Sequence, residues 1–523
     1  MTRSKLTRRD IVKGLATLPV LGAFAYGAWR KIRYDHYRSN KLSRELNMSD
    51  PVISRIPKRY EGDPLRIGLI GYGIRGEQLL RAAGFAHPEV IQSWKDASAG
   101  NSQDKRYSDY LAQDDLKIVV NGVCELFDVF LDRAAVASAN TGREGLNGTR
   151  GQQAKKYKNY HDLLAADDID AVIIAVPDHW HARMVIDAAK AGKHVYVEKG
   201  LSRTLEEVYA IRKAVKESGI VFQLGHQGRQ TESYIKAREA IEKNILGKVN
   251  LVEICTNRNS PNGAWVYDID PRGNEQTIDW EKFEEPCETK HPFSPERFFR
   301  WRCWWDYGTG LSGDLLTHEY DAINQIIGMG IPETVIASGG VYFYKEKDHY
   351  VHEIREVPDV WNAVFEYPDR DFTMLYSATL ANNRERGKVI MGHDASMEIG
   401  HNLSIYACAE STRYKEQIAS GLINPDNPIY SYIPGRKDVD AVASATEQYF
   451  AGRGLLYTYR DGKRVDTTHL HIAEWLEAIR EGKQPSCNVD QAFEEGITAA
   501  MATLAHKENR KVYWDRDQER VIM

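Results

Sequence analysis

The stretch LRIGLIGYGIRG, residues 65 to 76, decides the fold. Its first six residues form a short apolar run that predicts a buried strand, and its glycines at 71, 73 and 76 follow the G-x-G-x-x-G pattern of a tight turn that opens a helix. Such a turn brings backbone N–H groups and a helix N-terminus to one point, where a pyrophosphate binds. The predicted dinucleotide-binding turn comprises Gly71, Tyr72, Gly73, Ile74, Arg75 and Gly76.

The strand and helix pattern continues to about residue 225. Further apolar runs that predict strands cover residues 116–124, 171–176, 194–197 and 220–224, and a helical pattern follows the run at 171–176. Repeated strand and helix units indicate a doubly wound parallel sheet whose ligands bind beyond the carboxyl ends of the strands. We therefore expect an α/β Rossmann domain over residues 65–225.

The second predicted strand ends in Glu125, an acid of the kind that binds the ribose hydroxyls of NAD. Its charge would repel the 2′-phosphate of NADP, so NAD is the expected cofactor and NADP remains the alternative. The usual spacing from the glycines to this acid is about 20 residues, and here it is far longer. The assignment therefore requires the polar residues 85–115 to be an insertion; otherwise Glu125 is a solvated strand end.

After about residue 245 the pattern changes to alternation. Residues 361–367 and 372–380 each alternate apolar and more polar side chains, and Pro368 and Asp369 separate the two runs. This pattern predicts a hairpin in a sheet with one buried face. We expect an α+β substrate-binding domain over residues 226–523 with an open, mainly antiparallel sheet. A late helical stripe should be part of the core and comprises Ile472, Trp475, Leu476 and Ile479.

The N-terminus resembles a twin-arginine export signal. The motif TRRDIVK at residues 7–13 precedes an apolar run at 14–29, which is shorter than the roughly 20 residues needed to span a bilayer. We expect residues 1–29 to be this signal, with a retained membrane anchor as the alternative, and residues 30–64 to be a linker or arm. Export by the twin-arginine machinery would place the protein in the periplasm or cell envelope. Free NAD is scarce there, so the cofactor should travel with the protein.

Composition argues against several kinds of partner. The formal net charge is −5, from 69 basic and 74 acidic residues, and no basic stripe follows the leader, so nucleic acid is not an expected partner. The six cysteines contain no C-x-x-C pair, and His179 and His181 lack a matching set of acids or cysteines, so no metal site is predicted. A neutral or mildly polar small molecule fits this composition better.

Three motifs resemble the Gfo/Idh/MocA oxidoreductase family: VPDHWHA at residues 176–182, AGKHV at 191–195 and VEKG at 197–200. The resemblance covers roughly residues 65–515. It implies a Rossmann domain, a second substrate domain, a nicotinamide cofactor and a homodimer or homotetramer. It also implies cofactor contacts from Val176, Pro177, Asp178, His181, Glu198, Lys199 and Gln227.

The family's Glu-Lys-Pro signature, which carries an active-site lysine, is Glu198-Lys199-Gly200 in this chain. Proline would fix the turn, whereas Gly200 permits positive φ and more freedom. A lysine beside the nicotinamide can hold the substrate hydroxyl and, if desolvated, exchange a proton. The resemblance therefore implies that Lys199 is catalytic.

Asp314 and His318 lie four residues apart, which places them on one face of a helix, with Asp321 one turn further. They resemble the family's Asp-x-x-x-His pair. Oxidation of a secondary alcohol needs a base for the hydroxyl proton, and imidazole titrates in the useful range. We predict that Asp314 and His318 are catalytic and contact the substrate. The alternative is that Asp314 caps a helix and His318 is a packed core residue.

Aromatic and polar side chains gather just before this helix. Aromatic faces stack on the C–H faces of sugars, while charged groups bind their hydroxyls, so this cluster predicts a site for a sugar or glycoside. Arg229 follows a predicted strand in a position similar to the family's polar substrate loop. The predicted substrate contacts are Arg229, Trp301, Trp305, Asp306 and Tyr307.

Three functions compete. The first is an oxidoreductase that moves hydride between a tightly held NAD and a secondary hydroxyl of a sugar or glycoside. The second is a glycoside hydrolase that cleaves by transient oxidation and elimination, as NAD-dependent members of the same superfamily do. The third is a non-enzymatic carbohydrate sensor with a vestigial cofactor site, which the retention of Lys199 and His318 disfavours.

Overall fold

The computed structural model describes residues 41–42, 44–48, 60–141, 152–345, 355–434 and 457–523. The expected export signal and most of the expected arm lie outside these residues. Within the described part of the arm, Leu42 and Leu46 are buried in the main hydrophobic core, and the Lys243 amine donates a hydrogen bond to the Asn47 carbonyl. No helix among the described residues combines the length and apolar character needed to cross a membrane.

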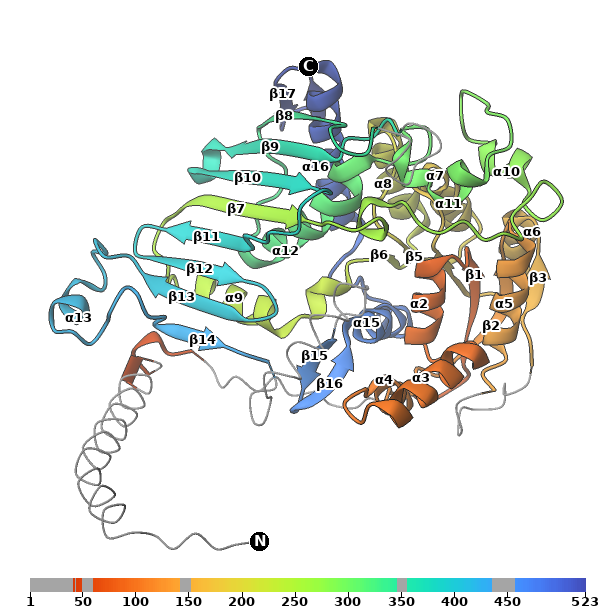
Figure 1. Cartoon of the computed structure of the whole chain (residues 1–523), viewed down its shortest axis with the longest axis horizontal. Helices are drawn as coiled ribbons and strands as arrows, with labels where there is room; N and C mark the ends of the chain where they lie inside the picture. The colour runs from red at the N-terminus through yellow and green to blue at the C-terminus, as the bar shows by residue number, and fades with distance from the viewer. Residues whose placement is uncertain (1–40, 43, 49–59, 142–151, 346–354, 435–456) are drawn as a thin grey trace, which may run out of the picture.

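A six-stranded parallel sheet forms the first unit (Figure 1). Its strand order, β3-β2-β1-β4-β5-β6, is that of the Rossmann fold and confirms the predicted fold class. The strands are β1 (Leu65–Ile70), β2 (Ile118–Cys124), β3 (Lys155–Tyr157), β4 (Ala171–Ile174), β5 (His194–Val197) and β6 (Phe222–Leu224). Strand β3 was not predicted, because its two exposed lysines leave it no apolar run.

Helices cover both faces of this sheet. One face packs against α2 (Ile74–Ala82), α5 (Asp128–Ser138) and α15 (Thr467–Glu481), and the other against α6 (Tyr160–Leu164), α7 (Asp178–Lys190) and α8 (Leu205–Ser218). The stripe on α15 is core as predicted, because Trp475 and Leu476 are fully buried. It packs on the first sheet, however, although the predicted boundary at residue 225 assigns it to the second domain.

Local sequence explains where α8 starts and stops. Thr204 and Glu207 form a capping box, in which the Thr204 hydroxyl accepts from the Glu207 N–H at 3.3 Å and the Glu207 carboxylate accepts from the Thr204 N–H at 3.0 Å. Gly219 ends the helix in a left-handed conformation with φ of 67°. This exact placement matters because α8 follows the Glu198-Lys199-Gly200 turn.

The polar stretch at residues 85–115 is an insertion with its own small core. It forms α3 (Pro88–Gly100) and α4 (Arg106–Leu111), whose Trp94 and Tyr110 rings meet edge to face with centroids 5.7 Å apart. Arg464, on the two-stranded sheet of β15 (Tyr457–Arg460) and β16 (Lys463–Asp466), binds Asp109 of α4 through its Nε at 2.9 Å. The insertion accounts for the long spacing between the glycine turn and Glu125.

A ten-stranded sheet dominates the second unit. Its order is β14 (Tyr430–Tyr432), β13 (Leu403–Ala407), β12 (Ala395–Ile399), β11 (Lys388–Gly392), β7 (Val249–Asn257), β10 (Phe372–Thr379), β9 (Val360–Tyr367), β8 (Thr334–Gly340), β17 (Val512–Asp515) and β18 (Arg520–Ile522). Only β7 and β10 pair in parallel among these described strands, so the mainly antiparallel prediction is confirmed. The helices on its covered face are α9 (Glu232–Glu242), α12 (Thr317–Ile327) and α16 (Val489–Glu508).

Strands β9 and β10 form the predicted hairpin. Trp361 pairs with Ala378 and Phe365 with Met374 in the antiparallel register. Every second side chain of β10, beginning with Phe372, is buried. The alternation in the sequence therefore reports a sheet with one covered face.

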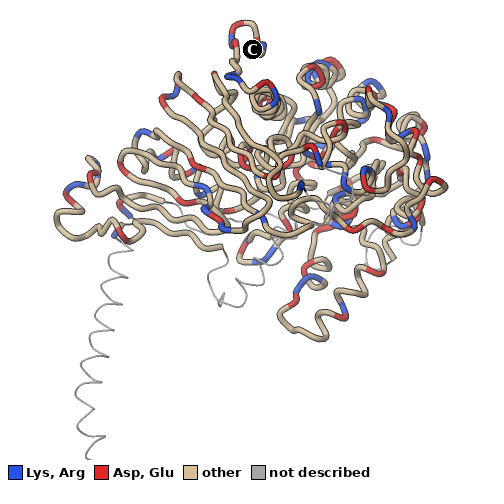
Figure 2. The backbone as a smooth tube through the Cα atoms, turned by 45° about the horizontal axis from the view of Figure 1, so that its top comes forward, with Lys and Arg blue, Asp and Glu red and all other residues tan. Residues whose placement is uncertain are grey.

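Acidic and basic residues are interspersed along both units rather than collected by sign (Figure 2).

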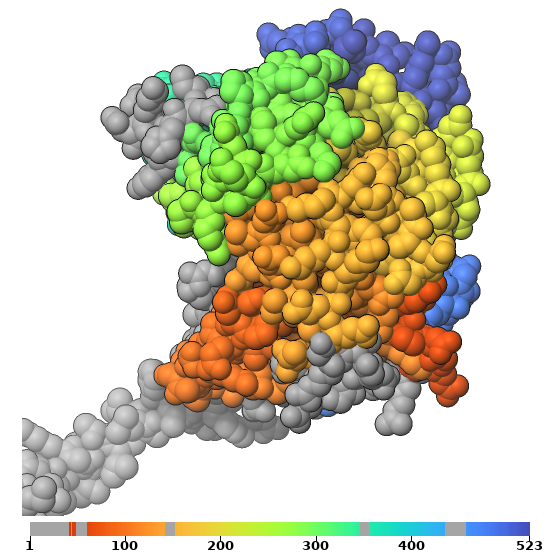
Figure 3. Space-filling view, turned by 90° about the vertical axis from the view of Figure 1, so that its right-hand side faces the viewer, coloured from red at the N-terminus to blue at the C-terminus, as the bar shows by residue number. Residues whose placement is uncertain are grey.

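The segment between β7 and α12 crosses to the first unit. There the Asp128 N–H donates to the Thr277 carbonyl at 2.9 Å, and the Asp279 N–H donates to the Leu126 carbonyl at 3.1 Å. Figure 3 shows its green surface lying against the orange and yellow surface of the first unit. This segment carries short helices α10 (Trp280–Glu284) and α11 (Pro295–Phe299).

Candidate functional site

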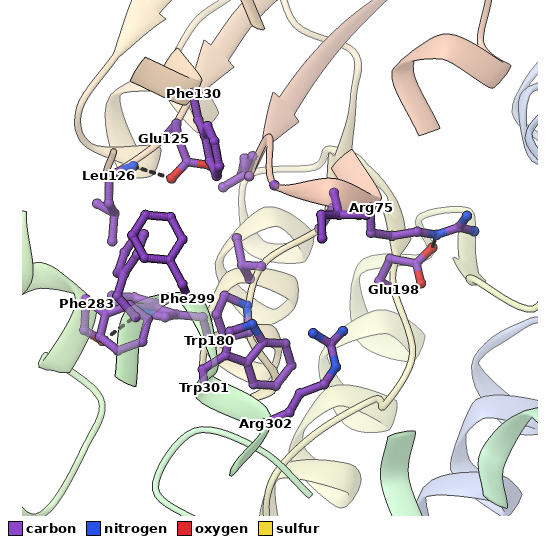
Figure 4. Close-up of a pocket in the computed structure, with 18 of the residues that line it drawn as sticks. Arg75, Glu125, Leu126, Phe130, Trp180, Glu198, Phe283, Phe299, Trp301 and Arg302 are labelled. Atoms are coloured by element: carbon purple, nitrogen blue, oxygen red, sulfur yellow. Dashed lines mark hydrogen bonds and ion pairs between the residues drawn. The ribbon is translucent and has the colours of Figure 1, made fainter. Parts of the chain in front are cut away.

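A cavity of about 1080 Å³ lies beyond the carboxyl ends of β1, β2, β4 and β5, and residues from the crossing segment close its outer side. This is where a doubly wound sheet binds its ligand. Figure 4 shows Glu125 at one side of the cavity and the Arg75–Glu198 pair at another. Trp301 and Arg302 lie between that pair and the rings of Phe283 and Phe299. We call the part around residues 71–75 and Glu125 the glycine end. The lysine end comprises Lys199, Arg302, Asp314 and His318.

The glycine end is shaped by backbone that tolerates no side chain at two positions. Gly71 has φ of 90°, and a Cβ there would lie 2.4 Å from the Ala175 carbonyl oxygen. A Cβ on Gly76 would lie 2.1 Å from the Gly71 carbonyl oxygen. Gly73, in contrast, has open space around its Cβ position and immediately precedes α2. Free space in front of a helix N-terminus fits the pyrophosphate of a dinucleotide.

Glu125 follows β2 and lines the cavity. Its carboxylate accepts from the N–H groups of Tyr72 and Leu126, each at 2.7 Å, and of Phe127 at 3.2 Å. Burial nevertheless raises the pKa of Glu125, and these backbone donors offset only part of that shift. Tyr72 contributes its N–H alone, because its side chain is buried in the sheet core and does not line the cavity.

Arg75 links the two ends of the cavity. Its Nε donates to Glu198 at 2.7 Å and its Nη2 donates to Gln227 at 2.9 Å. Glu198 is almost fully buried, and the pair is drawn with its contact in Figure 4. Because Glu198 immediately precedes Lys199, the pair fixes the strand end from which the lysine projects.

The lysine end is held together by a shared carboxylate. Lys199 Nζ lies 2.5 Å from Asp314 Oδ1, and Arg302 Nε donates to the same oxygen at 2.9 Å. The side chains of Lys199 and Asp314 are only 10% and 9% exposed. Burial raises the pKa of Asp314, but the charges and hydrogen bonds of Lys199 and Arg302 outweigh it and hold the pKa well below the usual range. Asp314 is therefore ionised.

His318 lies one turn after Asp314 and lines the same end. The two residues are not on one regular helix, because Asp314 belongs to a π-helical turn, Ser312–Leu316, that leads into α12. Burial, together with the charges of Lys199 and His226, lowers the pKa of His318 well below its ordinary value. The imidazole is therefore neutral at pH 7 and can accept a proton. Asp314 does not cap α12, because it lies inside the helical turn that leads into α12 and its carboxylate accepts from Lys199 and Arg302.

Gly200 serves a different purpose from the one the sequence suggested. Glycine permits positive φ, but Gly200 is not among the positive-φ glycines, and the Lys199–Gly200 peptide bond is cis. A Cβ on Gly200 would lie 2.9 Å from the Gly313 carbonyl oxygen and 3.3 Å from the Thr309 hydroxyl oxygen. The glycine lets the lysine turn pack closely against the turn that carries Asp314.

Two of the cofactor contacts that the family resemblance implied, Asp178 and His181, lie behind the cavity wall. Val176 and Pro177 line it, as do Glu198, Lys199 and Gln227. Asp178 is buried and accepts from the Thr309 N–H and hydroxyl at 3.2 and 2.7 Å, and His181 Nδ1 contacts the Gly200 carbonyl at 2.6 Å. Asp178 and His181 thus fix the loops around the lysine end rather than face a ligand.

Of the predicted substrate contacts, Trp301 alone among the aromatic cluster lines the cavity. Tyr307 is fully buried and donates to Glu284. Asp306 lies 2.9 Å from His291 Nε2, and Trp305 packs beside Lys507, whose Nζ is 4.3 Å from the ring centroid. Spacing in the sequence could not show which side of this compact segment each ring would take.

Arg229 also differs from its prediction. Its guanidinium donates to Asp321 through Nε at 2.8 Å and to the Ser486 carbonyl at 2.7 Å, and both Arg229 and Asp321 are buried. The side chain does not line the cavity. It instead joins α12 to the loop before α16, so Asp321, one turn beyond His318, is structural as well.

Most residues on the outer wall of the cavity were not predicted from the sequence. Phe283, Phe298 and Phe299 form a connected aromatic cluster on the crossing segment. Arg302 and Arg258 were missed too, although Arg302 lies inside the aromatic run that the prediction singled out. Their sequence signal was weak because neither belongs to a motif with a required spacing.

Two models of an oxidoreductase family match this chain. The model described as "Oxidoreductase family, NAD-binding Rossmann fold" matches residues 126–226, and "Oxidoreductase family, C-terminal alpha/beta domain" matches residues 238–513. A levoglucosan dehydrogenase from Pseudarthrobacter phenanthrenivorans is 29% identical over 218 residues, which is 40% of this chain and 48% of the relative. That alignment therefore spans about half of the relative's length.

Two further proteins are similar to this chain. A glycosyl hydrolase family 109 protein from Shewanella sp. is 30% identical over 173 residues, 33% of this chain and 30% of the relative. A solved levoglucosan dehydrogenase in complex with NADH and levoglucosan has the same fold, with a TM-score of 0.56 and 18% identity over 86% of this chain and 99% of that one.

Proposed function

The chain belongs to the Gfo/Idh/MocA oxidoreductase family, and from that premise we propose that it moves hydride between bound NAD(H) and a secondary hydroxyl of a sugar or glycoside. Its first unit is an NAD-binding Rossmann domain. The observation that carries the proposal is the buried contact of 2.5 Å between Lys199 and Asp314 beside a neutral His318. A levoglucosan dehydrogenase among the similar proteins supports a sugar as the substrate class.

The chain has residues that fit the cofactor. The N–H groups at the start of α2 and the open space at Gly73 would hold the pyrophosphate, and Glu125 would bind a ribose hydroxyl with its remaining acceptor capacity. NAD supplies the hydride acceptor when it is bound. The charge of Glu125 disfavours a 2′-phosphate, which supports NAD over NADP.

His318 is the proposed base. Its neutral imidazole accepts the proton of the substrate hydroxyl as the C–H bond of the same carbon gives up hydride, so the alcohol becomes a ketone. Lys199 donates a hydrogen bond to the substrate oxygen and stabilises the negative charge that develops on it. Asp314 holds the lysine amine in place through Oδ1 and its carbonyl, the latter at 3.2 Å.

A substrate screen tests the proposal. Purified protein should carry nucleotide, which denaturation releases, and addition of a substrate sugar should change the absorbance of the bound nicotinamide near the reduced band. His318→Gln should abolish the change in nicotinamide absorbance while nucleotide remains bound. A preparation that neither contains nor binds NAD(H) would overturn the proposal.

A second candidate is glycoside cleavage by transient oxidation, which the similarity to a glycosyl hydrolase family 109 protein supports. Oxidation of the C3 hydroxyl acidifies the C2–H, and loss of that proton expels the aglycone from C1. Water then adds to C1 of the resulting enone, and the stored hydride returns to C3. The two candidates share Lys199 and His318. Chromogenic glycosides separate them: release without added NAD supports cleavage, and accumulation of a keto sugar supports dehydrogenation.

The proposal extends to export and to a tightly held cofactor. The motif TRRDIVK at residues 7–13 supports passage through the twin-arginine machinery to the periplasm or cell envelope, with residues 14–29 cleaved or kept as an anchor. A resident cofactor then requires a second substrate that returns the oxidation state, or a reaction that is redox-neutral overall. Fractionation of cells that express the wild type and an Arg8→Lys, Arg9→Lys variant tests this, since the variant should stay in the cytoplasm.

A homodimer or homotetramer is also proposed. The ten-stranded sheet has one face that its helices do not cover, and large apolar side chains near its β8 and β17 edge are exposed, among them Ile336 at 46% and Tyr513 at 45%. Such a patch favours contact with a second copy. Light scattering should give a mass of two or four chains, and a monomer would overturn this part.

A further inference from the structure

The terminal N–H groups of Arg302 lie at the lysine end and can donate hydrogen bonds to a ligand. Its Nε is held by Asp314, and its guanidinium carbon lies 4.1 Å from the centroid of the Trp301 ring. Neither of its two terminal nitrogens has a hydrogen-bond partner within the described residues. Figure 4 shows the side chain extending beside Trp301 into the open part of the cavity. An arginine anchored at Nε in this way presents a fixed pair of donors to a ligand.

Arg258 adds a second cation on the same wall. It follows β7, lines the cavity, and is half-buried. Its side chain makes no hydrogen bond or ion pair with any residue that the structure describes. Its charge contributes to the lowered pKa of His318, as do the charges of Lys199 and His226, and it also acts on Tyr267. Arg258 therefore faces the reacting groups.

The charges at this end do not balance. Lys199, Arg302 and Arg258 supply three cations, and Asp314 is the carboxylate that contacts the first two. Asp178, which Thr309 binds behind the cavity wall, also acts on Lys199 and Arg302, so the cations still outnumber the carboxylates. The nearby Asp270 is paired with Arg272 at 2.9 Å, and Asp268 is exposed at the rim. Partly buried cations that lack a counter-charge are costly unless a ligand supplies it.

We propose that Arg302 and Arg258 bind a carboxylate on the substrate, so that the sugar oxidised at this site is a uronic acid or a glycoside of one. The inference rests on the proposed sugar oxidoreductase function and narrows its substrate class. The guanidinium of Arg302 binds the carboxylate through its two free nitrogens, and Trp301 packs on the apolar face of the sugar ring. The two arginines thus select for a carboxylate close to the reacting hydroxyl, because Arg302 shares Asp314 with Lys199.

The test measures binding by matched pairs of sugars to the full-length, nucleotide-containing protein. D-glucuronate and D-galacturonate are compared with D-glucose and D-galactose, and with glucose 6-phosphate and galactose 6-phosphate, by isothermal titration calorimetry at fixed ionic strength. At least one uronate should bind about tenfold or more tightly than its neutral partner. If no uronate is preferred, the inference is overturned, and a stronger preference for the 6-phosphate overturns the carboxylate assignment.

Two variants locate the effect. Arg258→Gln removes a side chain that holds no described neighbour, and Arg302→Lys keeps the charge but loses the planar pair of donors. Each should bring the uronate preference close to one while NADH affinity stays at its wild-type value. Arg258→Gln breaks no described contact and should also keep the wild-type melting temperature. Weaker NADH binding in these variants would assign the arginines to the cofactor and overturn the inference.

The outcomes also distinguish failure of the proposed function from failure of the anion site. Uronate binding without any redox change of bound NAD on any sugar would overturn the proposed function and leave the anion site standing. Turnover of neutral sugars alone, with no uronate preference, would keep the proposed function and remove the anion site. Reduction of bound NAD by a uronate, together with loss of the uronate preference in Arg258→Gln, supports both.

Discussion

The glycine end and the lysine end of one cavity are built by different means. At the glycine end, three glycines within six residues shape the backbone, and side chains contribute little beyond Glu125. At the lysine end, Lys199 from the first unit meets Arg302 and Asp314 from the second. The charges of Lys199 and Arg302 lower the pKa of Asp314, while burial and the charge of Lys199 lower the pKa of His318. The glycine end therefore depends on the absence of Cβ atoms, whereas the lysine end depends on the presence of particular charges.

The largest effect should come from removing the central cation of the lysine end. Lys199→Ala leaves the substrate oxygen without its donor, and we expect turnover to fall by about 10²- to 10⁴-fold with nucleotide still bound. Lys213→Ala, a surface change on α8 at a residue that is 74% exposed, is the matched control and should be neutral. Steady-state rates and the nucleotide content of the purified protein check this. Loss of bound nucleotide in Lys199→Ala would show that the two ends are not separate.

The glycine end should respond through stability. In Gly76→Ala the new Cβ meets the Gly71 carbonyl at 2.1 Å, so the helix and turn must move apart, and the free energy of unfolding should fall by about 1–3 kcal/mol. Gly73→Ala has open space and should keep wild-type stability while it weakens NADH binding. Urea unfolding and NADH titration distinguish the two. Equal destabilisation by both would contradict the proposed close approach at Gly76.

Cofactor choice should change less. Glu125→Gln keeps the shape of the side chain but removes its charge, so the penalty against a 2′-phosphate falls and the ratio of NADPH to NADH affinity should rise about tenfold, or ~1.4 kcal/mol. Fluorescence titration with both nucleotides measures the ratio. An unchanged ratio would mean that Glu125 does not face the adenosine ribose.

The smallest effect concerns pH. A histidine base with the ordinary pKa of about 6.5 would lose roughly tenfold in activity at pH 5.5. Because the pKa of His318 is lowered, its base form persists as pH falls, and the acid limb of kcat/KM should lie below that of an ordinary histidine. In Arg258→Gln one of the cations that lowers this pKa is gone, so the limb should move to higher pH. A wild-type limb at pH 6.5 would argue against His318 as the base.

A second buried histidine, His179, makes stability depend on pH, and the sign of that dependence is defined. An unfolded histidine takes up a proton near pH 6.5, whereas burial lowers the pKa of His179 to about 3. Between these values the unfolded chain binds more protons than the folded one, so the free energy of unfolding decreases as pH falls from about 6.5. Urea midpoints measured at pH 7.5 and 5 should show this decrease, and His179→Phe should reduce it.

Much of the fold could be predicted because its signals are local. The apolar run at 65–70, the glycine pattern and the alternation in 361–367 and 372–380 each depend on steric rules that act within a few residues. The exceptions are informative. Strand β3 has too few apolar residues to be visible, and α15 reaches the first sheet from the far end of the chain, which no local pattern records.

The sequence by itself determined the Rossmann turn, the acid that follows β2 and the presence of a lysine, an aspartate and a histidine able to do alcohol chemistry. Only the tertiary structure decided that Arg302 shares Asp314 with Lys199, that Arg229 is a buried structural residue, and that Trp301 faces the cavity while Tyr307 does not. The reason is physical: glycine sterics and side-chain periodicity are set by neighbours in the chain. The direction of a side chain in a loop is set by packing against segments that are distant in sequence.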